Sequence, residues 1–206
     1  MNKVNRCLNR VVYVIASHWL AMVNIAIGLL IGLSFIAPLA MELGLSQLGR
    51  LLYTAFIPFC HQQPERSFFL FGPQFTYSLR ELVRLVGPDV PRRYVGNTAI
   101  GFRLAICERD IGIYGGLLLA GLIFALLRER LRPLSVRYYL LLILPMVIDG
   151  SAQLLGLYES TWWLRLLTGV LFSIATVWLV YPMVEAGMRA VQRTAGKYLA
   201  ATTAYR

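Results

Sequence analysis

The chain has 206 residues, of which 58% are hydrophobic and only 15% are charged, and its net charge is +10. Soluble domains carry roughly 25% charged and 45–50% apolar residues, and a globule of this size has too little interior to bury so many apolar side chains. The composition therefore excludes a soluble enzyme, a secreted disulfide scaffold and a disordered chain. Most of the apolar surface is expected to face lipid.

Membrane-spanning segments are the first elements that the sequence predicts. A helix needs about 20 mostly apolar residues to cross a bilayer, because lipid offers no hydrogen-bond partners to free backbone groups. We predict an all-α membrane protein, a bundle of four transmembrane helices that forms a single membrane domain over residues 1–206. The predicted spans are residues 19–39, 111–127, 138–158 with one charge at Asp149, and 162–183 with one charge at Arg165.

The positions of lysine and arginine predict the orientation. Basic residues gather before the first predicted span, between the second and third, and after the fourth, and these three segments share one side of a four-span protein. The positive-inside rule places that side, and both chain termini, in the cytoplasm. The positive charge is then a topology signal and an attraction to anionic lipid, and no nucleic-acid partner is expected. The residues are Lys3, Arg6, Arg10, Arg128, Arg130, Arg132, Arg137, Arg189, Arg193, Lys197 and Arg206.

Residues 42–110 form a long extracytoplasmic insertion between the first two predicted spans. Leucines and a phenylalanine recur at helical spacing over residues 45–56, which predicts a helix at the membrane surface. Ser78 followed by Glu81 is a capping-box pattern, and it predicts a short helix over residues 78–86. We therefore expect a structured insertion with interfacial and short helices.

Glycines recur at four-residue spacing in two of the predicted spans. The pairs are Gly28 with Gly32 and Gly112 with Gly116. Small residues at this spacing let helices approach closely in a membrane. We interpret both pairs as packing positions within the bundle.

Two cysteine-containing motifs lie on the predicted outer side, and a polar pattern follows them in the last two predicted spans. The first motif is Cys60-His61-Gln62 followed by Arg66-Ser67. The second is Cys107-x-Arg109-Asp110-x-Gly112-x-Tyr114-x-Gly116. The later pattern is Asp149-Gly150, Gln153, Glu159-Ser160, Arg165 and Thr168-Gly169.

With these motifs the chain resembles an uncharacterised prokaryotic integral-membrane family, the domain of unknown function two thousand and eighty-five. The resemblance implies a multi-pass protein of the prokaryotic cytoplasmic membrane with a shared site and no established activity. This chain departs from the family pattern in two places. Asp110 replaces the second cysteine of a Cys-x-x-Cys pair, which puts thiol exchange in doubt. Residues 74–94 are an insertion relative to the family pattern, and we interpret them as a docking feature of this protein.

The pair formed by Cys60 and Cys107 has three interpretations. Thiols outside the cytoplasm tend to oxidise, so a structural disulfide would fix the long insertion to the second span. Alternatively, Cys60, His61, Cys107 and Asp110 supply two sulfurs, an imidazole and a carboxylate, a donor set that suits zinc. The third interpretation is a reactive redox pair, although no local Cys-x-x-Cys is present.

Charged and polar groups in the last two predicted spans form a second candidate cluster. A lone carboxylate in lipid is costly unless it is paired or protonated. At 1.5 Å rise per residue, Asp149 and Arg165 differ in height by roughly 6 Å, within the reach of an arginine side chain. We expect Arg165 to reach toward Asp149 and Gln153, either as a pin between helices or as a polar pocket open to the outer face.

Glu65, Arg66 and Arg109 flank the two cysteine motifs. Oppositely charged groups at these positions would hold the cysteines in place, as outer partners do around a metal. The alternative is that they are solvated charges at the membrane interface.

These observations favour a multi-pass membrane scaffold or accessory protein whose Cys/His/Asp site is structural or metal-binding. One alternative is a non-catalytic subunit of a larger bioenergetic complex, contacting other membrane subunits through residues 68–75 and the helix at residues 78–86. Another is a metal- or thiol-dependent membrane enzyme acting on a lipid or quinone. No P-loop, HExxH or nucleophile elbow is present, which favours a non-enzymatic role without deciding it.

Overall fold

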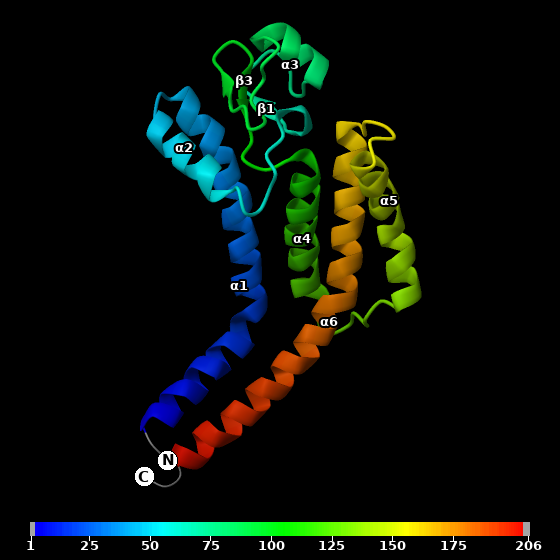
Figure 1. Ribbon diagram of the computed structural model, residues 1–206. Coiled ribbons are helices and arrows are strands. Elements are labelled where there is room, and N and C mark those ends of the chain that lie inside the picture. The colour runs from blue at the N-terminus through cyan, green and yellow to red at the C-terminus, as the bar shows by residue number, and fades with distance from the viewer. Residues whose placement is uncertain (1–2, 204–206) are drawn as a thin grey trace.

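Four long helices form the body of the protein in the computed structural model, which describes residues 3–203 and so leaves Arg206 outside the described residues. They are α1 (Lys3–Glu42), α4 (Glu108–Leu127), α5 (Val136–Leu154) and α6 (Trp162–Thr203) (Figure 1). Among the described residues, α1, α4 and α6 are the three helices long and apolar enough to cross a membrane. The protein is therefore mostly helical, with three candidate spans where four are predicted from the sequence.

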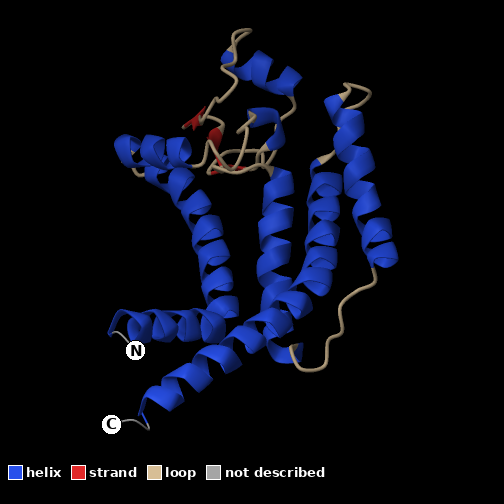
Figure 2. Ribbon diagram, turned by 60° about the horizontal axis from the view of Figure 1, so that its bottom comes forward, coloured by secondary structure: helices blue, strands red, loops and turns tan. Residues whose placement is uncertain are grey.

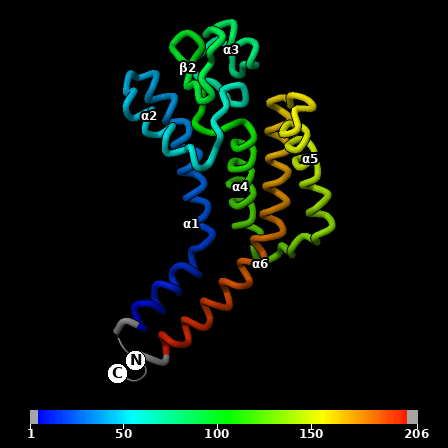
Figure 3. Tube along the Cα trace, in the orientation of Figure 1, coloured from blue at the N-terminus to red at the C-terminus, as the bar shows by residue number. Residues whose placement is uncertain are grey.

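Helices α1 and α6 are longer than the spans predicted for them. They contain 40 and 42 residues, or about 60 Å each at 1.5 Å per residue, whereas the hydrocarbon core of a bilayer is about 30 Å thick. Their polar ends continue beyond α4 and converge (Figure 3). There the amide of Gln192 donates to the hydroxyl of Ser17 over 2.8 Å.

A buried carboxylate joins three helices at the end of the body away from the insertion. Glu185 on α6 accepts hydrogen bonds from the Trp19 indole on α1 at 2.9 Å and from Arg128, just after α4, at 2.7 Å. Arg189, one turn along α6, pairs with the same carboxylate at 2.7 Å. Glu185 is only 4% exposed. The hydrogen bonds and ion pairs that its carboxylate makes with these three residues offset the cost of removing it from water.

The insertion combines two short helices with a small sheet, so the protein is mostly helical where an all-α fold is predicted. Helices α2 (Ser46–Ala55) and α3 (Leu79–Val86) accompany a 3₁₀ turn, η1 (Pro64–Arg66), and strands β1 (Phe69–Leu70), β2 (Gly96–Asn97) and β3 (Gly101–Arg103). The strands form an antiparallel sheet in the order β1-β3-β2, drawn red in Figure 2. Strands of two or three residues are too short to leave an alternating pattern, so the sequence gives no signal for them.

The capping-box pattern that predicts a short helix over residues 78–86 is confirmed. Ser78 caps this helix, and its backbone N–H donates to the Glu81 carboxylate at 2.7 Å. Residues 68–75, for which contact with other membrane subunits is a prediction, differ in their exposure. Phe68 and Phe69 are buried, whereas Phe71 and Phe75 are each about half exposed.

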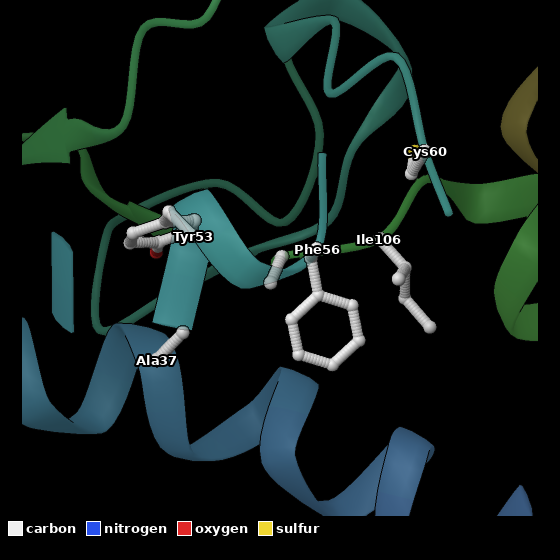
Figure 4. Close-up of a cluster of buried hydrophobic side chains, with 6 residues drawn as sticks. Ala37, Tyr53, Phe56, Cys60 and Ile106 are labelled. Carbon is white, nitrogen blue, oxygen red and sulfur yellow. The ribbon is translucent and has the colours of Figure 1, made fainter. Parts of the chain in front are cut away.

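The insertion rests on α1 through a hydrophobic cluster. Tyr53 and Phe56, at the end of α2, pack with Ala37 of α1 and Ile106 of the segment leading into α4 (Figure 4). Cys60 belongs to the same cluster and is buried. This packing fixes the position of the first cysteine motif relative to the start of α4.

Helices α4 and α6 approach so closely that glycine is required at their contact. A Cβ atom at Gly112 would lie 2.4 Å from the carbonyl oxygen of Leu166, and one at Gly169 would lie 2.7 Å from the carbonyl oxygen of Arg109. The packing role predicted for Gly112 is therefore confirmed. It is wrong for Gly28 and Gly32, where an added Cβ would meet nothing within 4 Å.

This difference gives a matched pair of variants. We expect Gly112→Ala to lower stability by about 1–3 kcal/mol, because the added methyl must push two helix backbones apart. Gly28→Ala adds the same methyl to open space and should be neutral or slightly stabilising, since alanine has the better helix propensity. Thermal unfolding of both variants in one detergent measures the difference, and equal midpoints would contradict the close contact.

Candidate functional site

A pocket of about 370 Å³ lies where the insertion meets the start of α4, the end of α5 and the start of α6. Both cysteine motifs and the polar residues of α5 and α6 contribute to its walls. The residues that line it are Phe59, Cys60, His61, Gln62, Gln63, Arg66, Arg92, Cys107, Arg109, Asp110, Gln153, Leu154 and Arg165.

Two free thiols and a carboxylate meet in this pocket. The ligand atoms of Cys60, Cys107 and Asp110 all lie within 4.8 Å of one another, and neither cysteine is in a disulfide. The Cys107 thiol donates to the Asp110 carboxylate over 3.0 Å. His61 lines the same pocket with an exposed side chain and is not part of this group.

The start of α4 explains why Cys107 and Asp110 meet. Cys107 is the N-cap residue of the helix, and its backbone N–H points toward the Asp110 carboxylate at 3.4 Å. A carboxylate three residues after an N-cap normally closes back on the cap in this way. The same turn therefore places a thiol and a carboxylate oxygen side by side.

The Cys107 thiol is held in its protonated form. Its hydrogen bond with Cys60, its burial and the negative charge of Asp110 all raise the pKa of the Cys107 thiol well above its usual value. A thiol with a raised pKa is a poor nucleophile at neutral pH. It can still bind a metal, because the ion displaces the proton.

Cys60 is positioned by the residue that follows His61 in the first motif. Gln62 is 2% exposed and has a positive φ of 59°, and its backbone N–H points at the Cys60 sulfur over 3.4 Å. Its amide donates to the Tyr53 carbonyl at 2.6 Å and accepts from Arg103 at 2.9 Å. The glutamine thus ties the loop that carries Cys60 to α2 and β3.

Arg103 is a structural residue that the sequence analysis missed. It is fully buried and donates to the Tyr94 carbonyl at 2.8 Å, to the Leu104 carbonyl at 3.0 Å and to Gln62. Its guanidinium lies over the Tyr53 ring, 4.9 Å from the centroid. Burial lowers the pKa of Arg103 to about 10, so it stays charged at neutral pH. No signal in a single sequence distinguishes it from an exposed arginine.

Two buried ion pairs connect the start of α4 to its neighbours, and the predicted pairing of Arg165 with Asp149 is wrong. Arg165 pairs with Glu108 at 2.8 Å, while Asp149 pairs with Arg109 and also accepts from Tyr158. The height estimate placed Asp149 and Arg165 within reach but took no account of the two charges at the start of α4. Glu108 therefore pairs with α6, whereas the Arg109 side chain reaches α5.

Arg109 also explains the pattern Asp149-Gly150-x-x-Gln153. Its guanidinium donates to the Gln153 side-chain oxygen at 3.3 Å. A Cβ atom at Gly150 would lie 3.2 Å from the same guanidinium. Glycine therefore leaves room for the arginine to lie against α5 between its acceptors.

The charged residues that flank the cysteines lie in or beside the pocket wall. Arg109 holds α5 and lines the pocket, and Arg66 lines the pocket as well. Glu65 contributes its backbone carbonyl, which accepts from Arg165 at 3.4 Å. These contacts fix the pocket wall around the thiols.

The pair formed by Glu108 and Arg165 lends itself to a double-mutant cycle. Their side chains are 1% and 8% exposed, so Glu108→Gln or Arg165→Met alone should lower the unfolding free energy by about 3–5 kcal/mol by leaving a buried charge without its partner. The double variant should lose less than the sum of the two. Additive losses in chemical unfolding would show that the two side chains do not interact. The control is Glu159→Gln, which makes the same change at an exposed position.

Comparison with known proteins supports the resemblance seen in the motifs. Residues 98–179 match a family described as "Predicted membrane protein (DUF2085)". An uncharacterized protein of Methanocaldococcus jannaschii is 29% identical over 134 residues, which is 64% of this chain and 67% of that protein. No solved structure gives a significant match.

The matched segment contains the α4, α5 and α6 residues of the pocket, and Cys60 lies outside it. The resemblance inferred from the cysteine motifs is therefore confirmed: residues 98–179 of this chain match the DUF2085 family of predicted membrane proteins.

Proposed function

We propose that this protein is a multi-pass membrane scaffold or accessory protein that binds zinc through Cys60, Cys107 and Asp110. The observation that carries the proposal is the meeting of these three ligand atoms within 4.8 Å on the wall of one pocket. Sulfur and carboxylate oxygen are both ligands that zinc accepts. The backbone N–H of Gln62 at the Cys60 sulfur is the kind of outer contact that orients a metal ligand.

The proposed site has three protein ligands. Zinc is almost always four-coordinate in structural sites, and three protein ligands leave a position for water or another molecule. This open position faces a pocket of about 370 Å³. The same arrangement occurs in catalytic zinc sites, so a zinc-dependent membrane enzyme is the second candidate function.

Metal analysis of the detergent-purified protein tests the proposal. We expect one zinc per chain, lost in Cys107→Ala because two of three ligands bind at least about 100-fold more weakly. Cys7→Ala removes an exposed free cysteine outside the group and should keep the metal. His61→Ala should keep it too, since this side chain lies outside the three-ligand group.

A disulfide gives the opposite result in the same sample. If the intact mass is lower by two protons than that of the reduced protein, and no metal is present, the zinc proposal is wrong. The two cysteines would then serve to fix the insertion to α4. Equal zinc content in the wild type and in Cys107→Ala would likewise exclude the site.

We further propose that α5 is a fourth span. Helices α4 and α6 both begin at the end of the body that carries the insertion (Figure 1). If both cross the membrane, the chain between them must cross back, and α5 runs beside α6 in that interval. Its 19 residues cover about 28 Å, and the pairing of Asp149 with Arg109 neutralises its carboxylate.

We also propose that the insertion is extracytoplasmic and that both termini are cytoplasmic in a prokaryotic membrane. The segment after α4 carries Arg128, Arg130 and Arg132, and it lies at the end of the body opposite the insertion. An excess of basic residues in short loops favours the cytoplasmic side. The pocket would then open outward, where thiols need a metal or a partner to stay reduced.

Reporter fusions test this topology. A phosphatase that is active only outside the cytoplasm should be active when fused after residue 90 or residue 158 and inactive when fused after residue 132 or residue 200. Inactivity after residue 158 would contradict the fourth span. The reverse pattern at every position would contradict the orientation while leaving the number of spans intact.

The accessory role draws support from apolar side chains on the insertion. Phe71, Phe75, Leu79 and Leu85 are each about half exposed. Exposed apolar side chains of this kind are typical of contact with lipid or with another membrane subunit. They suit a protein that docks on a membrane partner while its pocket remains open.

A further inference from the structure

The pocket that holds the thiols is lined by more arginines than carboxylates. Four arginines line it, Arg66, Arg92, Arg109 and Arg165, against one carboxylate, Asp110. Two of these arginines have partners behind the pocket wall, Glu108 and Asp149. In the described part of the chain, Arg66 and Arg92 have no carboxylate within ion-pair distance, so the pocket has an unbalanced positive charge.

Hydrogen-bond donors without acceptors occur in the same wall. The Nε atoms of Arg109 and Arg165 and the Nε2 atom of Gln153 are buried and have no hydrogen-bond partner. Arg165 is 6% exposed and Gln153 is 8% exposed. Buried donors are nearly always paired in folded proteins, so three orphan donors in one pocket indicate an acceptor that comes from outside the chain.

The orphan donors come from three helices. Arg109 belongs to α4, Gln153 to α5 and Arg165 to α6. Helices α4 and α6 also begin at the pocket, and the N-terminal end of a helix favours negative charge. A ligand that satisfies this set must be anionic and must offer acceptor oxygens in several directions.

We propose that the pocket binds a phosphate group, held by Arg165, Arg109 and Gln153 and attracted by Arg66 and Arg92. A phosphate monoester has three free oxygens and a free phosphate ion has four, in a tetrahedral arrangement, and guanidinium groups match their geometry. A planar carboxylate offers its acceptor sites in one plane, whereas a tetrahedral phosphate suits donors that come from three helices. The phosphate can be a free ion or the headgroup of a lipid in the outer leaflet.

This inference goes beyond the proposed function, because its donors are not the metal ligands. Cys60, Cys107 and Asp110 supply sulfur and carboxylate oxygen, while the phosphate contacts come from guanidinium and amide nitrogens. A phosphate oxygen would lie in the same pocket as the open zinc position. Because the two sites use different residues, a substitution can remove one site and leave the other.

Phosphate binding is tested with the full-length protein in detergent after treatment with a chelator. Inorganic phosphate is titrated by calorimetry, and we expect Gln153→Leu and Arg92→Ala each to weaken its binding about five- to tenfold, the effect of losing one hydrogen bond or one charge at an anion. Arg80→Ala removes an exposed arginine of the insertion that does not line the pocket and should leave it unchanged. Cys107→Ala, which is expected to lose zinc in the metal analysis above, should keep phosphate.

Lipid as the source is tested in parallel. The protein is placed in nanodiscs that contain phosphatidic acid, and bound lipid is counted by native mass spectrometry for the same variants. The proposal is supported if the protein binds free phosphate, or retains phosphatidic acid alone. In either case Gln153→Leu and Arg92→Ala must weaken the binding of that ligand, and Arg80→Ala must leave it unchanged. Because Arg92 is exposed, its variant carries the test even if Gln153→Leu fails to fold. Binding of neither ligand, or equal weakening by Arg80→Ala, would overturn it.

Discussion

The first turn of α4 is the constraint on which the site depends. Residues point in directions about 100° apart around a helix, so successive side chains at its start reach different neighbours. Cys107 meets Cys60 of the insertion, Glu108 meets Arg165 of α6, and Arg109 meets Asp149 of α5. This arrangement requires α6 to lie against α4, which glycine at their contact permits. One helical turn thereby joins the insertion to two further helices and forms a pocket between them.

Buried charge is tolerated here because each ion has a counter-ion on a neighbouring element. An unpaired buried charge would cost several kcal/mol, whereas the attraction within a well-placed pair offsets much of that cost, and removal of one partner is strongly destabilising. The same reasoning applies at the other end of the body, where Glu185 joins α1, α4 and α6. In a lipid environment the two networks add polar contacts between helices to the van der Waals packing of the bundle. They also leave unpartnered arginine donors in residues that line the pocket, and the proposed phosphate site depends on these donors.

Local patterns predicted more than distant ones. Hydropathy located the helices, and the spacing of Ser78 and Glu81 located α3, since both depend on neighbours in sequence. The two cysteine motifs were recognised and do meet. The predicted pairing of Arg165 with Asp149 was wrong because two arginines and two acids lie near one another, and the direction of each side chain decides which pairs form. Arg103 and the three short strands left no trace, because their contacts join residues far apart in the chain.

The central claim is that the start of α4 brings two thiols and a carboxylate together as ligands of one metal ion. X-ray absorption at the zinc edge, on zinc-loaded protein in detergent, examines those bonds directly. We expect two sulfur atoms at about 2.3 Å and two oxygen or nitrogen atoms at about 2.0–2.2 Å from the metal. A shell of oxygen and nitrogen alone, with no sulfur, would contradict it.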